Sequence, residues 1–293
     1  MASPRADVLA RARSLIDQFS GQAGFFVHDL TTDESFGINS RETFPTASMI
    51  KLPILVELFH QVAAGRLDLD EPREIRQVDH VGGSGLLRHL SPGIRLPLRD
   101  LAYLMISVSD NTATNLCIDR VGIDAVNQRM TALGCPDLVL RNRIDFGHAW
   151  TEPDHLAVGT PEGFGRLLAR VWRKEILTPD ACEEMLRMMA GVGADRAGRY
   201  LPINPYAAEM TSHGLSTGPA VGFSGKTGGL VGVRGQVAAI WGDGLAFVLA
   251  VMTTGSSDWS WGVDAEGSLF AARLGKLVYD HLRDGSESAG PGV

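Results

Sequence analysis

Three short groups of polar residues have the types and the spacing that nucleophilic attack on a carbonyl carbon requires. Ser48 precedes Lys51 by three residues, Ser109 begins the group Ser-Asp-Asn, and Lys226 begins the group Lys-Thr-Gly. A serine hydroxyl is a weak nucleophile until a nearby base takes its proton, and a lysine with a lowered pKa can be that base. Each group alone is common by chance, but the three in this order predict an acyl-enzyme mechanism with Ser48 as the nucleophile.

The pair formed by Ser48 and Lys51 opens the apolar segment MIKLPILVELF, which is typical of a helix. The positive end of the helix dipole would stabilise an alkoxide at Ser48. Lys51 lies one turn further on the same face, within reach of that oxygen. Its apolar surroundings argue against a solvated lysine. We therefore expect Lys51 to act as the base, with Lys226 as a second cation that lowers its pKa.

Lysine is rare in this chain. Of 27 Lys and Arg residues only four are lysines, and two of these are Lys51 and Lys226. Arginine keeps its proton in proteins, whereas lysine serves either as a point charge or as a base. The retention of lysine at these two positions supports a role in proton transfer.

The group Ser109-Asp110-Asn111 lies between two helical segments, where these residue types are also ordinary helix caps. A capping role and a catalytic role are compatible. In the catalytic interpretation, Ser109 relays a proton to the leaving nitrogen, Asn111 binds the substrate amide, and Asp110 holds the loop.

The group Lys226-Thr227-Gly228 lies on a predicted strand. Strand alternation directs Lys226 and Gly228 to one face and Thr227 to the other. Small residues on an edge strand let a substrate backbone approach closely. We expect the backbone amides of Ser48 and Gly229 to bind the oxyanion.

The elements that must position these groups divide into strands at both ends of the sequence and helices between them. A helix is predicted over 4–19, and a closing helix near 263–283 precedes a tail that we expect to be disordered. The segments AGFFVHDL and ESFGIN favour strands near the N-terminus, and GFSGKTG, VRGQVAAIWG and LAFVLAVMTTG favour strands near the C-terminus.

From Phe44 to about Gly193 the pattern is almost wholly helical. Thr160-Pro161 and Thr178-Pro179 each place an N-cap hydroxyl before a proline at the first helical position. The fold expected is α/β: an antiparallel sheet flanked by N- and C-terminal helices, with an inserted all-helical domain. The predicted α/β domain comprises 1–43 and 205–293, and the predicted helical domain comprises 44–204.

Composition limits the classes of partner. The net charge is -7 and no run of basic residues occurs, which argues against a nucleic-acid surface. No apolar run reaches the length of a signal peptide or a membrane span, so we expect a cytoplasmic protein that does not engage membranes. The oligomeric state is left open.

The three cysteines are far apart and lack metal-ligand spacing, which fits a reducing compartment and predicts neither a disulfide nor a metal site. They are Cys117, Cys135 and Cys182.

Together these features resemble the serine β-lactamase superfamily, in which class A β-lactamases and penicillin-binding proteins carry the motifs Ser-x-x-Lys, Ser-Asp-Asn and Lys-Thr-Gly. The resemblance covers roughly 22–283 and includes the segments GSGLLRHL, LRDLAYLMISVSDNTATNLCID and KTGGLVGVRG. It implies the class A fold and no cofactor. It also implies that Asn115 supports the site and that Arg234 receives a substrate carboxylate, although a lone arginine is more often a solvated charge.

The sequence departs from class A enzymes in the segment that would release the acyl group. There the family has a Glu-Pro-x-Leu-Asn motif, whose glutamate activates water. The gapless match to that glutamate is Asp145, and the residue four positions later is Ala149 rather than asparagine. Asp145 is therefore either a catalytic or water-positioning residue or part of a structural salt bridge. Glu152 is the weaker alternative because it lies too near the helix expected after Thr160.

The function expected first is hydrolysis of a small molecule with an amide, lactam or ester carbonyl, most simply a β-lactam. A second interpretation is a cytosolic esterase, amidase or acyltransferase that acts on a metabolite through the same site. A third is a β-lactam sensor that is acylated once and stays acylated, as would follow if Asp145 cannot drive deacylation.

Overall fold

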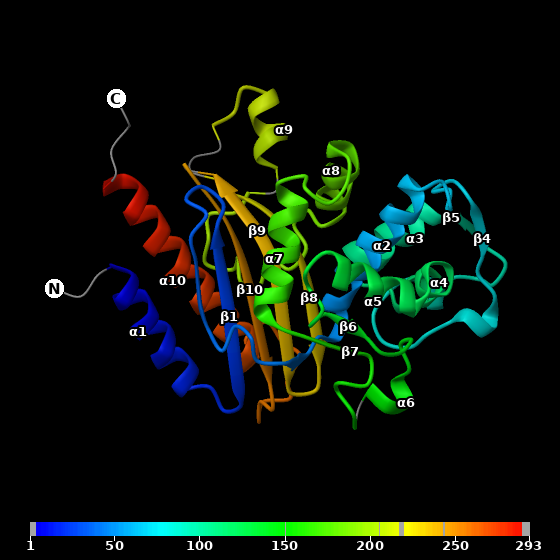
Figure 1. The fold of residues 1–293 in the computed structure, drawn as a ribbon, viewed down its shortest axis with the longest axis horizontal. Coiled ribbons are helices and arrows are strands. Elements are labelled where there is room, and N and C mark those ends of the chain that lie inside the picture. The colour runs from blue at the N-terminus through cyan, green and yellow to red at the C-terminus, as the bar shows by residue number, and fades with distance from the viewer. Residues whose placement is uncertain (1–3, 150, 205, 217–219, 243, 289–293) are drawn as a thin grey trace.

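The computed structural model describes residues 4–149, 151–204, 206–216, 220–242 and 244–288. Its centre is a five-stranded antiparallel sheet in which strands from the two ends of the chain are neighbours (Figure 1). The order of the strands across the sheet is β2-β1-β10-β9-β8. Their bounds are β1 Gln22–Asp29, β2 Ser35–Ile38, β8 Gly222–Leu230, β9 Val233–Gly242 and β10 Leu245–Thr254.

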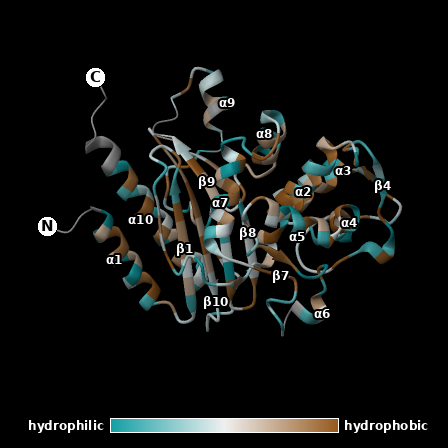
Figure 2. Cartoon of the chain, in the orientation of Figure 1, coloured by the Kyte–Doolittle hydropathy of each residue, from teal (hydrophilic) through white to brown (hydrophobic). Residues whose placement is uncertain are grey.

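Two terminal helices, α1 (Pro4–Asp17) and α10 (Glu266–Ser288), lie side by side on one face of the sheet (Figure 1). Hydrophobic and hydrophilic residues alternate along both helices, as expected when only one side of a helix is buried (Figure 2). The prediction of an antiparallel sheet flanked by terminal helices is confirmed. α10 continues past the predicted end at 283, and residues 289–293 of the predicted tail lie outside the described residues.

The two faces of the sheet belong to separate hydrophobic cores because side chains alternate along each strand. In β9, Ala238 and Ile240 pack toward α1 and α10, whereas Val237 and Ala239 pack toward the helical part of the chain. The long helix α7 (Pro161–Trp172) covers this second face and contacts β1, β9 and β10. The strand β8 thus forms the edge of the sheet that borders the helical part.

The helical part is built around α2 (Lys51–Ala63), in which ten residues are buried. α2 packs against four other α-helices of this part. The helices are α3 Leu98–Ser107, α4 Asn111–Val121, α5 Ile123–Ala132, α6 Phe146–Ala149, α8 Pro179–Met188 and α9 Ala207–Ser212, with 3-10 helices η1 Ala47–Ile50, η2 Gln77–Asp79 and η3 Leu87–His89.

The caps predicted at Thr160 and Thr178 are confirmed. Their hydroxyls accept hydrogen bonds from the amides of Gly163 at 2.9 Å and Ala181 at 3.4 Å, at the starts of α7 and α8.

This region is less uniformly helical than the sequence predicts, because five short strands occur within it. They are β3 Phe44–Pro45, β4 Pro72–Glu74, β5 Arg95–Pro97, β6 Val139–Leu140 and β7 Ala157–Gly159. β3 pairs with β7, with Phe44 opposite Gly159. This pairing holds the chain that leads into Ser48. The domain boundaries at 44 and 204 remain a prediction. Helix α7 lies between these positions in the sequence, yet it packs on the sheet.

Among the described residues, no helix is both long enough and apolar enough to cross a membrane. The described histidine, cysteine, aspartate and glutamate side chains include no group of three or more that could hold a metal ion. Cys117, Cys135 and Cys182 are all free and buried. Burial raises the pKa of the Cys117 thiol to about 12.

Candidate active site

Ser48 lies in the 3-10 helix η1, one short element before α2 rather than in the first α-helical turn. The residues on either side of it, Ala47 and Met49, are buried, whereas Ser48 is half-buried. Ala47 has a φ of 45°, an unfavourable left-handed conformation for a residue with a Cβ. Local strain of this kind is common where a fold must hold a reactive side chain in one position.

Lys51 is the first residue of α2, and its side chain is completely buried. Its Nζ donates hydrogen bonds to the Ser109 carbonyl at 2.8 Å, to Ser109 Oγ at 3.0 Å and to Asn111 Oδ1 at 2.8 Å. Burial, followed by the charge of Lys226, moves the pKa of Lys51 well below its ordinary value. The neutral amine, which can accept a proton, is therefore more accessible than in a solvated lysine.

Lys226 on β8 is also completely buried. Its Nζ donates to Ser109 Oγ at 3.1 Å and to the Thr227 carbonyl at 2.9 Å. Burial, followed by the charge of Arg196, lowers the pKa of Lys226 to about 7. Ser109 Oγ thus lies between two buried amines, with Lys51 Nζ at 3.0 Å and Lys226 Nζ at 3.1 Å. This arrangement can move a proton from one side of the site to the other.

Ser109 is held in this position by an unusual backbone conformation with a φ of 55°. Its carbonyl accepts hydrogen bonds from Lys51 and, at 2.7 Å, from the Ser84 hydroxyl. The next residue, Asp110, is the N-cap of α4 and accepts from the amide of Ala113 at 2.9 Å.

Asp110 also ties the neighbouring loop to the site. Its Oδ2 accepts hydrogen bonds from the amides of Leu86 at 2.6 Å and Leu87 at 2.8 Å. This loop can approach because residue 85 is glycine, where a Cβ would lie 2.4 Å from the Asp110 carboxylate. Asp110 therefore combines the two roles that the sequence suggests, cap and loop support.

Asn111 lies beside Lys51 with both ends of its amide engaged. Oδ1 accepts from Lys51, and Nδ2 donates to the Gly82 carbonyl at 2.8 Å. A substrate amide would share or displace one of these bonds. The structure therefore places Asn111 at the cavity but gives it a second function, orienting the Lys51 amine.

The strand β8 runs directly along the turn that contains the nucleophile. A Cβ at Gly228 would lie 2.4 Å from the Thr46 carbonyl and 3.1 Å from the Ser48 amide nitrogen. Only glycine permits this approach without a shift of the backbone. Because β8 is the edge of the sheet, its outer backbone is not paired with another of the five strands. Gly229 and Ser48 line the same cavity, and the Thr227 side chain is half-buried.

Arg234 on β9 is buried rather than solvated. Its guanidinium donates to the carbonyls of Leu230 at 2.6 Å and Val233 at 2.8 Å and also to the Ser260 carbonyl. The Trp261 ring covers it, with its centroid 4.6 Å from Arg234 Cζ. Trp261 lines the cavity, whereas Arg234 lies behind it. The Arg234 guanidinium is therefore engaged by backbone carbonyls and by the Trp261 ring.

Arg196 is a further cation of the site that sequence reasoning missed. It precedes a bend of the chain beside β8 and donates to the carbonyls of Gly228 at 2.9 Å and Gly235 at 3.3 Å. Burial, followed by the charge of Arg234, lowers its pKa to about 10. The sequence carries no signal for Arg196, because only the closure of the sheet brings it to Lys226.

The segment before Asp145 is pinned by Asn115. Its Nδ2 donates to the Ile144 carbonyl at 3.0 Å, and its Oδ1 accepts from the Ile144 amide at 2.9 Å. Asp145 itself is exposed and lines the cavity. Its Oδ1 accepts from the Gly147 amide at 2.8 Å, and its Oδ2 lies 3.0 Å from His148 Nδ1. These hydrogen bonds lower the pKa of the Asp145 carboxyl.

Ser48 opens into a cavity of about 340 Å³ at the junction of η1, α4, β8 and the segments 144–149 and 151–156. Its wall combines the polar groups described above with apolar side chains. The lining residues are Ala47, Ser48, Gly83, Ser84, Asn111, Ile144, Asp145, Phe146, Glu152, Pro153, His155, Leu156, Gly229, Leu230 and Trp261.

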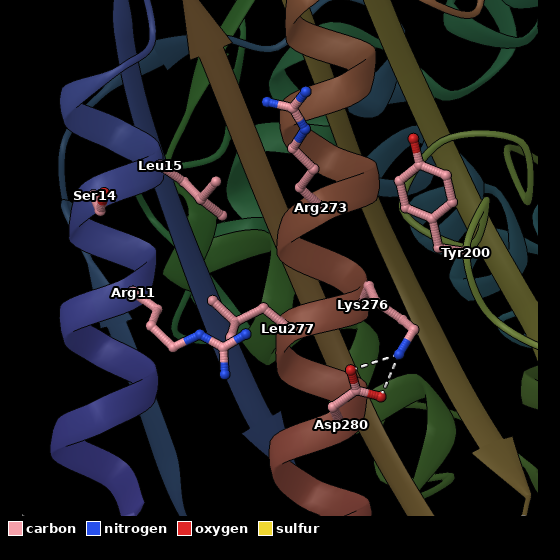
Figure 3. A pocket seen from close by; sticks show the side chains of 8 residues that line it. All are labelled: Arg11, Ser14, Leu15, Tyr200, Arg273, Lys276, Leu277 and Asp280. Atoms are coloured by element: carbon pink, nitrogen blue, oxygen red, sulfur yellow. Dashed lines mark hydrogen bonds and ion pairs between the residues drawn. The ribbon is translucent and has the colours of Figure 1, made fainter.

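A second cavity of about 350 Å³ lies at α1 and α10 (Figure 3). Its lining includes Lys276, whose Nζ is paired with Asp280 Oδ1 at 2.6 Å, and Ser14, whose Oγ accepts from Gln18. None of the three predicted motifs contributes to it. The catalytic groups that the sequence predicts therefore lie away from this second cavity.

Comparisons with known proteins agree with this geometry. The sequence model of the "Beta-lactamase enzyme family" matches residues 8–282. The "Beta-lactamase regulatory protein BlaB" of Streptomyces cacaoi is 27% identical, over 94% of this chain and 98% of that protein. A β-lactamase of Rhodobacter capsulatus is 24% identical, over 62% of each chain.

Solved structures give the same result. A β-lactamase from Sphaerobacter thermophilus is 30% identical and superposes with a TM-score of 0.77, covering 94% of this chain and 98% of the other. A mutant of PBP-A, solved as its acyl-enzyme complex with penicillin G, is 26% identical with a TM-score of 0.78, covering 95% of this chain and 97% of the other. With a family match over nearly its whole length and a site of this geometry, the chain belongs to the β-lactamase enzyme family.

Proposed function

We propose that the protein is a serine hydrolase that forms an acyl-enzyme at Ser48 with a β-lactam. The observation that carries this proposal is the position of Ser109 Oγ, within 3.1 Å of two buried lysine amines beside the Ser48 turn. Buried amines with lowered pKa values are unfavourable for stability, and such groups are typical of catalytic sites.

In the first step, neutral Lys51 takes the Ser48 proton while Ser48 Oγ attacks the carbonyl carbon. The amides of Ser48 and Gly229 bind the developing oxyanion. The proton then passes from Lys51 through Ser109 and Lys226 to the leaving nitrogen, and the carbon–nitrogen bond breaks. The hydrogen bonds that join Ser109 Oγ to both amines provide this route.

The cationic side of the site favours a substrate with a negative charge. Lys226, Arg196 and Arg234 lie along the β8–β9 hairpin, and none of the three forms an ion pair with a carboxylate of the described residues. A substrate carboxylate near them would lower the free energy of binding. The apolar wall formed by Phe146, Leu156 and Leu230 suits a hydrophobic acyl group.

Deacylation requires water to attack the acyl-enzyme. We propose Asp145 as a residue that positions this water, because it lines the cavity and is the gapless sequence match to the class A glutamate. Both of its oxygens already have partners, and its lowered pKa makes it a weak base. Efficient turnover therefore needs another proton acceptor.

A β-lactam sensor that stays acylated is the second candidate function. The relative from Streptomyces cacaoi is described as a β-lactamase regulatory protein, and the glutamate of class A enzymes is replaced here. The esterase, amidase or acyltransferase interpretation uses the same site and the same first step.

One experiment separates these functions. The protein is mixed with a chromogenic cephalosporin, and intact mass and absorbance are followed together. A transient adduct with continuing colour release is the result expected for the hydrolase. A lasting adduct would identify a sensor, and the absence of any adduct would contradict β-lactam chemistry and leave an ester or another amide as substrate.

A further inference from the structure

Two histidines stack against each other in the segment that follows Ile144. The ring centroids of His148 and His155 are 4.5 Å apart, with an interplanar angle of 14°. Each ring has its own carboxylate neighbour. His148 Nδ1 lies 3.0 Å from Asp145 Oδ2, and His155 Nδ1 lies 3.6 Å from Glu152 Oε2.

The two imidazoles differ in their access to Ser48. His155 lines the cavity that contains Ser48, whereas His148 does not line it. The His155 side chain is 22% exposed, against 52% for His148. His155 is therefore the ring of the stacked pair that borders the cavity.

The backbone fixes His155 at this place. Its amide donates to the Glu152 carbonyl at 2.9 Å, and its carbonyl accepts from Asn142 Nδ2 at 2.7 Å. A ring held between a stacked neighbour and a carboxylate has little rotational freedom. Nδ1 is the ring nitrogen nearer to Glu152, at 3.6 Å, so the tautomer with its hydrogen on Nδ1 would face the carboxylate and leave Nε2 as the acceptor.

We propose that His155 is the proton acceptor for the water that hydrolyses the acyl-enzyme, with Glu152 as its positioning residue. The proposal rests on the proposed function, because it concerns the second step at the same site. Imidazole is the side chain best suited to accept a proton near neutral pH. The family resemblance suggests Asp145 for this role. In the present proposal Asp145 instead orients the His148 ring and helps to place the water.

The step balances in atoms and charge. The water oxygen bonds to the acyl carbon while one water proton passes to His155 Nε2. The bond from the acyl carbon to Ser48 Oγ then breaks, and its electron pair stays on Oγ. The proton held by His155 returns through the site to Oγ, and the product leaves as a carboxylic acid that ionises in solvent. Ser48 and His155 are both restored.

Other charged groups near the two stacked rings also influence the pH dependence of the reaction. Glu152 and Asp145 face the two rings, and the neighbouring Asp154 is paired with Arg141 at 2.6 Å.

The test compares His155→Gln with His148→Gln, a matched control that removes the other ring of the same stack. Acylation by a chromogenic cephalosporin and the lifetime of the adduct are both measured by intact mass. We expect His155→Gln to lengthen the lifetime by at least about 100-fold, as for loss of a general base, with acylation changed by less than about threefold. His148→Gln should change either rate by less than about tenfold.

The pH profile provides a second readout. Wild-type deacylation should rise with pH through an inflection that His155→Gln loses, whereas any inflection due to Lys226 should remain in both proteins. Glu152→Gln should lengthen the adduct lifetime, and Glu152→Asp, which keeps the carboxylate, should recover part of the wild-type rate. A purely structural role for Glu152 would give no recovery in Glu152→Asp.

Four results would overturn the proposal. Equal lifetimes in wild type and His155→Gln would exclude His155, and prolongation only in Asp145→Asn would assign the role to Asp145. A lasting adduct in the wild type would mean that His155 activates no water, while the acyl-enzyme part of the proposed function would stand. If no adduct forms in any variant, the proposed function fails together with this step.

Discussion

Lys226→Met tests the physical basis of the site, because methionine keeps the length of the side chain and removes its charge. Burial lowers the pKa of Lys226 from 10.5 to about 7. Below pH 7 the amine is charged in both the folded and the unfolded protein, so the full unfavourable free energy of burying the charge is present. As the pH rises above 7 the folded protein loses this proton first, and the unfavourable contribution declines until it vanishes near pH 10.5.

The magnitude follows from the size of the shift. One pKa unit corresponds to about 1.4 kcal/mol, so the contribution of Lys226 to the free energy of unfolding should rise by about 3 kcal/mol between about pH 6.5 and about pH 9.5. Methionine has no proton to lose. The difference in stability between Lys226→Met and wild type should therefore shrink by this amount as the pH rises. The hydrogen bonds that Lys226 makes add an offset but little pH dependence.

The measurement is urea unfolding of both proteins at several pH values, with the free energies extrapolated to water. Because the same buffers are used, the titration of all other groups largely cancels in the difference. The matched surface control is Lys174→Met, at a residue paired with Glu183 on the surface, which should show no such slope. A difference between Lys226→Met and wild type that stays constant within about 0.5 kcal/mol would refute the inference that Lys226 is buried as a perturbed amine.

Three further predictions concern individual steps. Lys51→Arg should lower the single-turnover acylation rate by several orders of magnitude because guanidinium cannot accept the Ser48 proton, and a loss below about tenfold, about 1.4 kcal/mol, would make Lys51 merely electrostatic. Gly228→Ala should lower both acylation and thermal stability, since its Cβ would lie 2.4 Å from the Thr46 carbonyl; full acylation by this variant would show that η1 can move away from β8. Asp145→Asn should leave acylation nearly unchanged yet prolong the adduct, by about tenfold if it only positions water. An unaltered lifetime there would leave Asp145 with a purely structural role.

The sheet and its flanking helices could be predicted from the sequence because their patterns are long and regular. Strands such as 233–242 and 245–254 are almost continuously apolar, and the Thr-Pro pairs at 160 and 178 mark helix starts with a physical mechanism. The short strands at 44–45 and 157–159 were missed. Two or three residues carry no periodicity, and their pairing partner is distant in sequence.

Within the site, the sequence predicted the residues that belong to known motifs. It did not predict the residues that come together only when the chain folds. Ser48, Ser109 and Lys226 come from three distant segments, and their family pattern was sufficient to associate them. Arg196 and His155 belong to no sequence motif. Only the folded chain brings His155 to the cavity wall and Arg196 close to Lys226.

Two local details also differ from expectation. Ser48 lies in a 3-10 helix, because a strained Ala47 and contact with Gly228 shape the turn. Arg234 was expected to face substrate, whereas backbone carbonyls and Trp261 enclose it. Both differences arise from tertiary packing, which hydrophobic periodicity does not record.

The most direct test of the account is to locate the covalent bond. Wild type and Ser48→Ala are mixed with the same chromogenic cephalosporin, quenched in acid, digested and mapped by peptide mass. The account predicts one acylated peptide that contains Ser48 in the wild type, and neither adduct nor colour release in Ser48→Ala at unchanged thermal stability. An adduct on another residue, or turnover that persists in a folded Ser48→Ala protein, would contradict the assignment of Ser48 as the nucleophile.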